Sequence, residues 1–489
     1  MEFLVFFPVV TILYYVIPPR FKHIWLLIAS YFFYMCWNPE YSVLIALSTF
    51  ITWLSGILIS SVKTKKQKKL VVAGSFIINL SILVVFKYTG FIINNINSLL
   101  ALLGAQPIVL GFDIILPVGI SFYTFQALSY TVDVYRGDID CERNILKYAL
   151  FVSFFPQLVA GPIERSGNLL RQIERLDKKQ KLDFDKMARG LTLMVFGLFM
   201  KMVVADRISN LVNTVFNSYW MYGGVELVLA AVGFAIQIYC DFSSYSTIAI
   251  GAAEVMGFSL MENFNTPYLA RSVSDFWHRW HISLSTWFRD YLYIPLGGNR
   301  RGKLRKYFNI MVTFLVSGLW HGASWTFVVW GGLHGVYQVI GDATRPFKEK
   351  LNKRVHARTT TISYRALRVV ITFILVDFAW IFFRSASIED AFSYISRIFT
   401  AWDPWVFSQN VLYDMGLDMN EMNILLCALA LLILVDFIRY YKNERFDAFL
   451  SRQCIWFRWG VIIALIFAVV IYGVYGPNIP AQAFIYFQF

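Results

Sequence analysis

Charged residues are scarce in this chain of 489 residues. Asp, Glu, Lys and Arg make up 15% of it, hydrophobic residues make up 57%, and the mean hydropathy is +0.55. Because a soluble domain carries about 25% charged residues, lipid must be the solvent for much of this protein's surface. Apolar runs recur along the whole length, so we expect one integral-membrane domain over residues 1–489.

Neither a cysteine framework nor a cleavable leader is expected from the sequence. Its five cysteines show no Cys-x-x-Cys spacing, so neither a disulfide scaffold nor a metal site is expected from them. They are Cys36, Cys141, Cys240, Cys427 and Cys454. The N-terminus has neither a basic region nor a small-residue cleavage site, and residues 2–17 are therefore expected to be a retained first helix.

Long apolar segments take the place of these features. A spanning helix needs about 20 apolar residues, and the sequence offers about eleven candidates. They are residues 2–17, 24–37, 43–61, 70–86, 187–205, 225–239, 307–320, 325–340, 367–383, 423–438 and 459–475. Several are short, which is typical of tilted, broken or re-entrant helices. The predicted fold is thus an all-α polytopic membrane protein.

Positive charge predominates, with a formal net charge of +13, and it is placed in loops beside the apolar segments. The basic clusters are residues 63–69, 171–186, 300–306, 345–358 and 439–452. The positive-inside rule assigns them to the cytoplasm, which puts the N-terminus outside. Charge placed in this way sets topology and contacts anionic lipid, so nucleic-acid binding is not expected.

Three segments depart from a simple series of helices. Residues 114–119 and 154–163 carry proline and glycine in apolar surroundings, which mark broken or re-entrant helices. The third, residues 237–246, carries Asp241 inside an apolar run. Together they suggest a cavity or tunnel within the domain. Lys201 and Asp377 also lie in apolar runs, where we expect internal ion pairs.

His321 lies between two apolar segments that are flanked by the basic clusters 300–306 and 345–358. If both clusters are cytoplasmic, the chain must enter the membrane and return, with His321 near the turn. An arm of about 15 residues rises only about 22 Å at about 1.5 Å per residue, against a hydrocarbon core of about 30 Å. His321 is therefore expected inside the membrane, where an ionisable residue is a functional-site candidate.

Burial disfavours the protonated form of an imidazole, so His321 is expected to stay neutral and to act as a general base toward a hydroxyl. Trp320 and Trp325 flank it in the sequence and could exclude water or contact an acyl group. The alternative is a packed, hydrogen-bonded core histidine without a catalytic role. The Trp-His-Gly context favours the catalytic interpretation.

A second polar segment, residues 275–290, carries His278 and His281, which would share one face if the segment were a single helix. A metal site is the alternative, since His281, His321, His334 and Asp241 offer enough ligands. The spacing matches no HExxH-like pattern, and no metal is expected. Arg279, Arg289 and Asp290 are expected to form interfacial ion pairs. Recognition of an anionic cofactor is the alternative for these charges.

The cluster at residues 300–306 lies at the entry of the predicted hairpin. Arg300, Arg301 and Lys306, together with Arg289, could bind the phosphates of a donor molecule. As topology signals they need no such role, and the sequence leaves both interpretations open.

Several motifs in this order resemble those of the membrane-bound O-acyltransferase superfamily, and within it the alginate O-acetyltransferase (AlgI-like) group. The motifs are Leu116-Pro-Val-Gly-Ile-Ser-Phe-Tyr-Thr-Phe-Gln126, Phe155-Pro-Gln-Leu-Val-Ala-Gly-Pro162, Gln237-Ile-Tyr-Cys-Asp-Phe-Ser243, residues 275–299 and Gly318-Leu-Trp-His-Gly-Ala-Ser-Trp325, with a weaker match at Trp380-Ile-Phe-Phe-Arg384. The likeness is strongest over residues 116–341.

The resemblance implies a multi-helix bundle pierced by a tunnel. It places the family's active-site histidine on His321 and a second polar position on His281. Asp241, Ser243, Trp320 and Trp325 are the tunnel candidates. One departure is Ser243-Ser244, where Ser-Gly is expected, and it does not touch the histidines.

For function, the resemblance implies an O-acetyltransferase of the bacterial cell membrane. Acetyl-CoA would be the cytoplasmic donor substrate, with no permanently bound cofactor. The acceptor would be an extracytoplasmic polysaccharide such as alginate or peptidoglycan, served by a separate serine-hydrolase-like acetyltransferase or other polysaccharide-modifying proteins. The alternatives are D-alanyl transfer to teichoic acid, a transporter without chemistry, or a scaffold of a polysaccharide-modifying complex.

Overall fold

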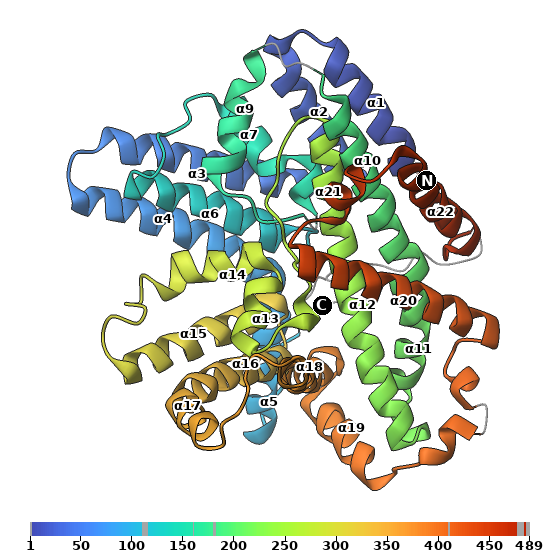
Figure 1. The fold of residues 1–489 in the computed structure, drawn as a ribbon. Coiled ribbons are helices and arrows are strands. Elements are labelled where there is room, and N and C mark those ends of the chain that lie inside the picture. Colours follow the sequence, from blue (N-terminus) through green and yellow to red (C-terminus); the bar gives the residue numbers. More distant parts are fainter. Residues whose placement is uncertain are drawn as a thin grey trace. The chain divides into compact units, whose positions relative to one another are not determined.

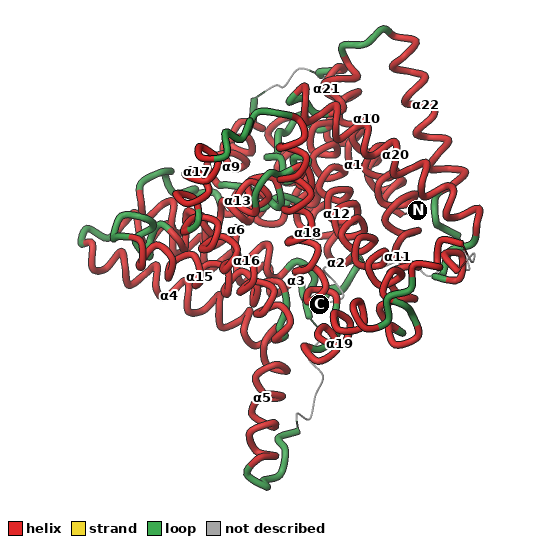
Figure 2. The backbone as a smooth tube through the Cα atoms, turned by 60° about the horizontal axis from the view of Figure 1, so that its bottom comes forward, coloured by secondary structure: helices red, strands yellow, loops and turns green. Residues whose placement is uncertain are grey.

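The computed structural model describes residues 2–109, 116–159, 161–178, 182–408, 411–476 and 484–485. Among these residues every regular element is a helix, and no strand is present (Figure 1, Figure 2). The predicted all-α class is therefore confirmed. The described chain divides into two compact units, each built from two stretches of sequence. The prediction of a single domain is not tested by this division.

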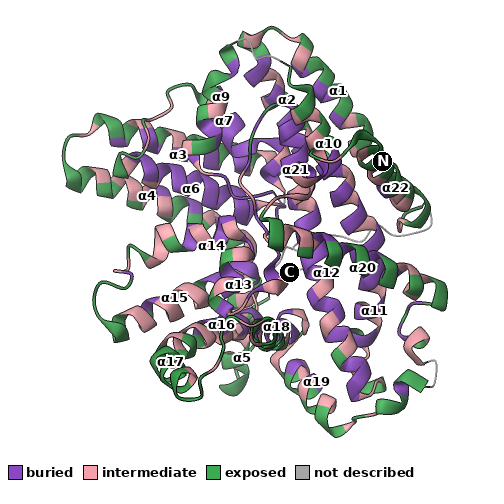
Figure 3. Cartoon of the chain, in the orientation of Figure 1, coloured by how far each residue is buried: buried purple, intermediate pink, exposed green. Residues whose placement is uncertain are grey.

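The first unit comprises Met1–Leu191 and Ala249–Met261. Its helices are α1 (Glu2–Val16), α2 (Lys22–Met35), α3 (Ser42–Ser61), α4 (Lys65–Leu83), α5 (Thr89–Leu102), α6 (Ile120–Arg136), α7 (Ile145–Ser153), α8 (Phe155–Leu158) and α9 (Ser166–Glu174). Helix α6 packs against both α3 and α4 and is buried on nearly all sides (Figure 3). Gly56 lets α3 come close, since a Cβ there would lie 2.6 Å from the Tyr130 hydroxyl.

The second unit comprises Thr192–Ile248 and Glu262–Phe489. Its helices are α11 (Asp206–Asn217), α13 (Val273–Arg279), α14 (Ile282–Phe288), α15 (Lys303–His321), α16 (Trp325–Ala343), α17 (Arg345–Arg354), α18 (Ile362–Arg384), α19 (Ile388–Thr400), α20 (Met419–Lys442), α21 (Phe446–Ser451) and α22 (Ile455–Tyr472). Two further helices, α10 (Phe184–Leu198) and α12 (Gly224–Val255), run from one unit into the other.

Within the described residues, seven helical stretches are long and apolar enough to span a membrane. They are Ser42–Ser61, Lys65–Leu102, Phe184–Asn217, Gly224–Val255, Ile362–Arg384, Met419–Lys442 and Ile455–Tyr472. Each of the eleven predicted segments coincides with a helix, but α1 and α2 are shorter than a full span. The chain is thus a multi-pass membrane protein, while the count of eleven spans is not confirmed.

The predicted break near Phe154 is present, and its backbone groups find specific partners. Helix α8 begins at Phe155, with Pro156 in its first turn, and the Phe155 N–H donates to the Ser30 hydroxyl (3.1 Å) instead of continuing α7. The carbonyl of Phe151 accepts from the side-chain amides of Gln126 (2.6 Å) and Gln157 (3.0 Å). Buried backbone groups freed by a helix break need such partners, so the break is a built feature of the first unit.

The other two expected departures have different outcomes. Residues 114 and 115 lie outside the described residues, and Gly119, the N-cap residue before α6, has the left-handed conformation (φ 72°). The segment 237–246 is an uninterrupted part of α12, so the expectation of a broken helix there is wrong. The polar residues of this segment are accommodated by ion pairing and by hydrogen bonds within the helix, as shown below.

Candidate active site

The predicted hairpin around His321 is present as helices α15 and α16. Helix α15 ends at His321 because Gly322 turns to an extended conformation. The next helix begins after Ser324, whose hydroxyl accepts from the Thr326 N–H (3.3 Å) as an N-cap. Only three residues separate the helices, so His321 lies at the tip of the hairpin, as expected. Its depth in a membrane stays a prediction.

Glycine on both helices lets the hairpin close tightly. A Cβ on Gly318 would lie 2.3 Å from the Phe327 carbonyl oxygen, and one on Gly331 would lie 2.3 Å from the Phe314 carbonyl oxygen. No side chain fits at such distances without moving a helix. Close backbone approach at small residues is the usual packing of helices in lipid, and here it holds the end of α15 against α16.

The imidazole of His321 is buried among aromatic rings. The side chain is 3% exposed, and its ring centroid lies 4.9 Å from that of Trp330, 5.0 Å from Trp320 and 5.7 Å from Phe383. These rings come from α15, α16 and α18 and meet the imidazole edge to face. They exclude water from most of the ring, which is the environment expected for a neutral base.

His281 lies between α13 and α14 and is fully buried, at 0% exposure. Its backbone is in the left-handed conformation (φ 43°, ψ 55°), which is uncommon for a residue other than glycine and clusters at functional sites. Because α13 ends at Arg279, His278 and His281 do not share a helix face, contrary to the sequence expectation. His278 is exposed, and its ring donates to the Ser274 carbonyl.

The two buried imidazoles are neighbours. The ring centroids of His281 and His321 are 6.4 Å apart, and Trp320 contacts both rings. Helix α12 adds the ring of Phe242, which meets His281 edge to face at 4.6 Å. Burial lowers the pKa of His281 to about 3, so this ring is neutral at physiological pH. A neutral imidazole can accept a proton from a hydroxyl or a thiol.

A third buried histidine extends this region. His334 on α16 accepts a hydrogen bond at Nδ1 from the Trp277 indole N–H (3.2 Å). Trp330 packs against both His334 and His321, at 5.1 and 4.9 Å between ring centroids. The sequence named His334 only as a possible metal ligand, and it did not place Trp330 or Trp277 in the site. Trp330 lies nine residues after His321, on the second arm of the predicted hairpin, and this position was the available signal for it. Nothing in the sequence placed Trp277 beside it.

The structure describes all four tunnel candidates but assigns them unequal surroundings. Trp320 is buried and Trp325 is 53% exposed. Asp241 is buried on α12, where its carboxylate binds Lys201 Nζ (2.7 Å) and accepts from the Ile485 N–H (2.8 Å). Ser243 is buried two residues further along α12. Whether these residues line a tunnel stays a prediction.

Lys201 has the internal partners that the sequence could not identify. Its ammonium group lies 2.7 Å from Asp241 and 2.8 Å from Asp206, so one cation serves two carboxylates. Lys201 lies in a π-helical stretch, Phe199–Ala205, that joins α10 to α11. The wider turn of a π-helix shifts the register of the following residues, and such stretches are frequent at functional sites. For Asp377, no ion pair is seen among the described residues.

The four candidate donor-binding residues fall into two groups: Arg289 and Lys306 each pair with a carboxylate, and Arg300 and Arg301 lie in an exposed loop. Arg289 pairs with Asp290 (2.7 Å), and Lys306 pairs with Asp342 at the far end of α16 (2.7 Å). Arg279 pairs with Asp275 (2.8 Å), as the ion-pair interpretation expected. Arg300 and Arg301 are exposed in the loop before α15. Of the four candidates, Arg300 and Arg301 are the two for which no ion pair is seen among the described residues.

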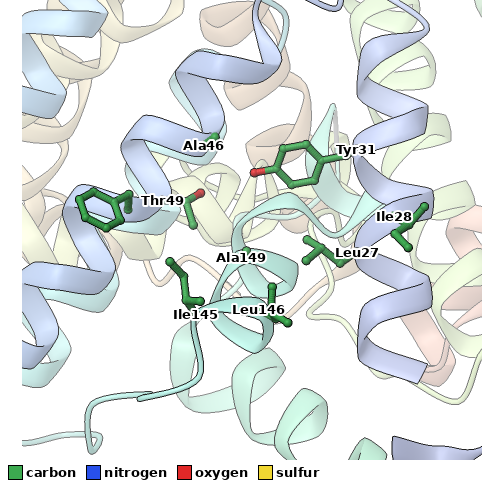
Figure 4. A pocket seen from close by; sticks show the side chains of 9 residues that line it. Leu27, Ile28, Tyr31, Ala46, Thr49, Ile145, Leu146 and Ala149 are labelled. Carbon is green, nitrogen blue, oxygen red and sulfur yellow. The ribbon is translucent and has the colours of Figure 1, made fainter. Parts of the chain in front are cut away.

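Among the described residues, no three His, Cys, Asp or Glu side chains gather as metal ligands would. A pocket of about 360 Å³ lies between α2, α3 and α7 of the first unit (Figure 4). Apart from the hydroxyls of Tyr31 and Thr49, its lining is apolar, so it offers no base for acyl transfer.

Comparison with known proteins identifies the family of this chain. The chain belongs to the membrane-bound O-acyltransferase family, whose model matches residues 143–376. That range contains His281, His321 and the helices from α7 to α17. The protein is therefore an acyltransferase of membranes.

Individual relatives are similar over most of their length. A probable alginate O-acetylase AlgI of Azotobacter vinelandii is 39% identical over 82% of this chain and 77% of its own. A peptidoglycan O-acetyltransferase of Helicobacter pylori is 35% identical over 76% of this chain and 73% of its own. A teichoic acid D-alanyltransferase of Bacillus subtilis is 25% identical over 54% of this chain and 68% of its own.

Proposed function

We propose that this protein is an O-acetyltransferase that moves acetyl groups from cytoplasmic acetyl-CoA across the membrane to an extracytoplasmic polysaccharide. The names of its relatives support acetyl as the group transferred, since the two with the higher identities are an alginate O-acetylase and a peptidoglycan O-acetyltransferase. The observation that carries the chemistry is the pair of buried imidazoles, His281 and His321, with ring centroids 6.4 Å apart.

The reaction follows from what a neutral imidazole does. His321 accepts the proton of the acceptor hydroxyl while the hydroxyl oxygen attacks the thioester carbonyl carbon. The tetrahedral intermediate collapses, the carbon–sulfur bond breaks, and the imidazolium returns its proton to the departing thiolate. The aromatic rings around His321 exclude bulk water, which would otherwise compete as acceptor. Transfer through a transiently acetylated His321 is the variant of this mechanism.

The donor would approach from the side of the basic loop before α15. Arg300 and Arg301 are exposed there and suited to the phosphates of a coenzyme A molecule. Arg289 and Lys306 each already hold a carboxylate, at 2.7 Å in both cases, so their contribution to binding would require exchange of partners. This orientation places the basic loops in the cytoplasm of a bacterial cell membrane and the N-terminus outside.

The acceptor would be reached on the other side. An alginate-like polymer, peptidoglycan or another cell-surface glycan is the expected final acceptor. A separate serine-hydrolase-like acetyltransferase outside the membrane would carry the acetyl group onward, and the hydroxyl that meets His321 would belong to that partner or to the glycan. Other polysaccharide-modifying proteins would complete the assembly.

D-alanyl transfer to teichoic acid is the second candidate function. It is favoured by relatives named teichoic acid D-alanyltransferase, which are 25% and 27% identical over about half of this chain. The same histidine chemistry would serve, with a D-alanyl thioester as donor. The lower identity and shorter coverage make acetyl transfer the better supported proposal.

The test is acetyl transfer in sealed membrane vesicles, with labelled acetyl-CoA supplied on the cytoplasmic side. The wild type would be compared with His321→Ala and His321→Gln at matched amounts of folded protein. His278→Ala is the matched control, because His278 is an exposed histidine that the mechanism does not use. Loss of a general base typically lowers a rate by about 10²–10⁴-fold, so both His321 variants should lose nearly all transfer.

Three outcomes decide between the functions. Label in glycan or partner protein with the wild type and with His278→Ala, but not with the His321 variants, supports the proposal. Transfer of a D-alanyl group but not of acetyl supports the second candidate. Equal label with His321→Gln and the wild type contradicts any catalytic role of His321 and favours a transporter or a scaffold.

A further inference from the structure

Asn263 gathers three donors on one side-chain oxygen. Its Oδ1 lies 2.9 Å from the Ser283 hydroxyl, 3.2 Å from the Ser283 backbone nitrogen and 3.1 Å from His281 Nδ1. Asn263 is 1% exposed, and its own backbone carbonyl accepts from the Ile282 N–H (2.9 Å). The segment that precedes α13 is therefore tied to the start of α14 by backbone and side-chain bonds.

The backbone N–H of Ser283 settles which atom of the Asn263 amide faces this cluster. A backbone nitrogen can only donate, so the side-chain atom opposite it must be the carbonyl oxygen and not the amide nitrogen. An oxygen in this position can only accept. His281 Nδ1 must then carry a hydrogen, because otherwise two lone pairs would face each other at 3.1 Å in a buried site.

The Ser283 hydroxyl is consistent with this assignment. Its hydrogen is directed to Asn263 Oδ1 at 2.9 Å, and its oxygen lies 3.4 Å from His281 Nδ1 as a second, weaker acceptor. With Nδ1 protonated in a neutral ring, the lone pair of His281 resides on Nε2. Burial lowers the pKa of His281 to about 3, so the doubly protonated ring does not compete at neutral pH.

The backbone of His281 shows that this arrangement is enforced. A non-glycine residue at φ 43° and ψ 55° costs free energy that the surrounding contacts must offset. Those contacts are the Asn263 cluster on one side of the ring and Phe242 of α12 on the other, at 4.6 Å between ring centroids. The imidazole is thus fixed in both orientation and tautomer.

We infer that Asn263 is a positioning residue that holds His281 in the Nδ1–H tautomer, so that His281 offers Nε2 as a proton or hydrogen-bond acceptor beside His321. This inference rests on the proposed transfer reaction only for its consequence. In that reaction His281 would accept from a hydroxyl or thiol, and it could not donate to the oxyanion of the tetrahedral intermediate. The two histidines would therefore both act as acceptors.

The neutrality of Asn263 has its own consequence. A carboxylate at this position would raise the basicity of the imidazole, as carboxylate–histidine pairs do. The titratable group that faces His281 among its described contacts is His321 of α15, while α12, α14 and the 263 segment present Phe242, Ser283 and Asn263. Asn263→Asp should accordingly raise the pKa of His281 and move the acidic limb of the pH–rate profile to higher pH.

The first experiment reads the tautomer directly. Solid-state ¹⁵N NMR of histidine-labelled protein in bilayers separates Nδ1–H from Nε2–H rings, and a His281→Gln sample assigns the signal of His281. The wild type and Asn263→Asp should show the Nδ1–H form, whereas Asn263→Leu should show the Nε2–H form or a mixture. An Nε2–H ring in the wild type, or an unchanged ring in Asn263→Leu, would overturn the inference.

The second experiment measures acetyl transfer against pH. Asn263→Leu should lower kcat about 10–100-fold with the KM for the donor unchanged, and Asn263→Asp should restore part of it with a shifted acidic limb. Asn79→Leu is the control, since it removes a buried asparagine of the first unit, bonded to Ser48 and to the Ser75 carbonyl, and should leave the profile unchanged. If the wild type has the Nδ1–H ring but shows no acetyl transfer, the proposed function is refuted and the tautomer is not. If the protein is active and the pH profiles of Asn263→Leu and the wild type are equal, the positioning role is refuted.

Discussion

Two buried polar clusters of the second unit differ in composition: one consists of paired charges and the other of imidazole rings among aromatic side chains. In the ion cluster, Lys201 binds the carboxylates of Asp206 and Asp241 at 2.8 and 2.7 Å. In the imidazole pair, His281 and His321 lie 6.4 Å apart between centroids among aromatic rings. Neighbouring residues of α12 serve the two clusters, since Asp241 binds Lys201 and Phe242 packs on His281.

The difference separates groups that hold the fold from groups that are available for chemistry. A charge buried in a membrane protein needs a partner, and the ion cluster supplies one cation for two carboxylates and a backbone N–H. Neutral imidazoles need no counter-charge, so they keep the capacity to take up a proton. The comparison predicts that changes in the ion cluster act on stability and changes in the imidazole pair act on rate.

The largest effect on stability is expected for Lys201→Met. This change removes the shared cation and leaves Asp206 and Asp241 buried without it, which costs about 3–5 kcal/mol when a buried pair is broken. Asp241→Asn should cost less, because Lys201 keeps Asp206 as a partner. Chemical unfolding of the purified protein in detergent measures both free energies of unfolding.

An exposed ion pair provides the control for this prediction. Arg345 and Glu349 lie 3.0 Å apart with side chains 75% and 62% exposed, so Arg345→Met should change the free energy of unfolding by less than about 1 kcal/mol. If Lys201→Met were no more destabilising than Arg345→Met, the ion cluster would not hold the fold.

An intermediate effect is expected at the hairpin that carries His321. A methyl group on Gly318 would lie 2.3 Å from the Phe327 carbonyl oxygen and force α15 away from α16, whereas one on Gly332 would meet Leu315 at an ordinary 3.6 Å. Gly318→Ala should cost about 1–3 kcal/mol, as overpacking does, and should lower the transfer rate by displacing His321. Gly332→Ala should change neither quantity, and equal effects of the two substitutions on thermal stability and rate would argue against close approach as the determinant.

A dependence of stability on pH is expected from a buried carboxyl outside both clusters. Glu164 of the first unit accepts from the Met261 N–H and the Asn168 amide, and burial raises its pKa from 4.5 to about 7. A raised pKa means that the folded state binds the proton more tightly than the unfolded state. The contribution of this carboxyl to the free energy of unfolding is therefore complete below pH 4.5 and is lost as the pH rises through about 7. Glu164→Gln should flatten this dependence in thermal unfolding scans between these pH values, and an equal slope in the variant would assign it to another group.

Much of the fold follows from hydropathy, and the exceptions have physical causes. Every predicted apolar segment is helical, because lipid-exposed backbone must satisfy its hydrogen bonds internally. The break predicted at residues 237–246 is absent, because Asp241 is paired within the helical structure by Lys201, which lies 40 residues away in sequence. The sequence alone does not show this pairing, so it cannot distinguish a charge with a buried partner from a break in the helix.

The site was only partly predictable, because most partners of the histidines are distant in sequence. His321 follows from its place between two apolar arms, and the hairpin follows from the basic loops at each end. The rings of Trp330 and Phe383, and the oxygen of Asn263, come from other elements, and no local pattern links them to the histidines. Even the pairing of His281 with His321 depended on a family resemblance, because the left-handed turn at His281 breaks the helical spacing that the sequence suggested.

The most direct test of this account compares His321→Gln with Asp241→Asn in one preparation, measuring both the rate of acetyl transfer per folded molecule and the free energy of unfolding. The account predicts that His321→Gln loses the rate and largely keeps the stability, while Asp241→Asn loses stability and largely keeps the rate per folded molecule. An Asp241→Asn protein of unchanged stability that no longer transfers acetyl groups, or a fully active His321→Gln protein, would contradict it.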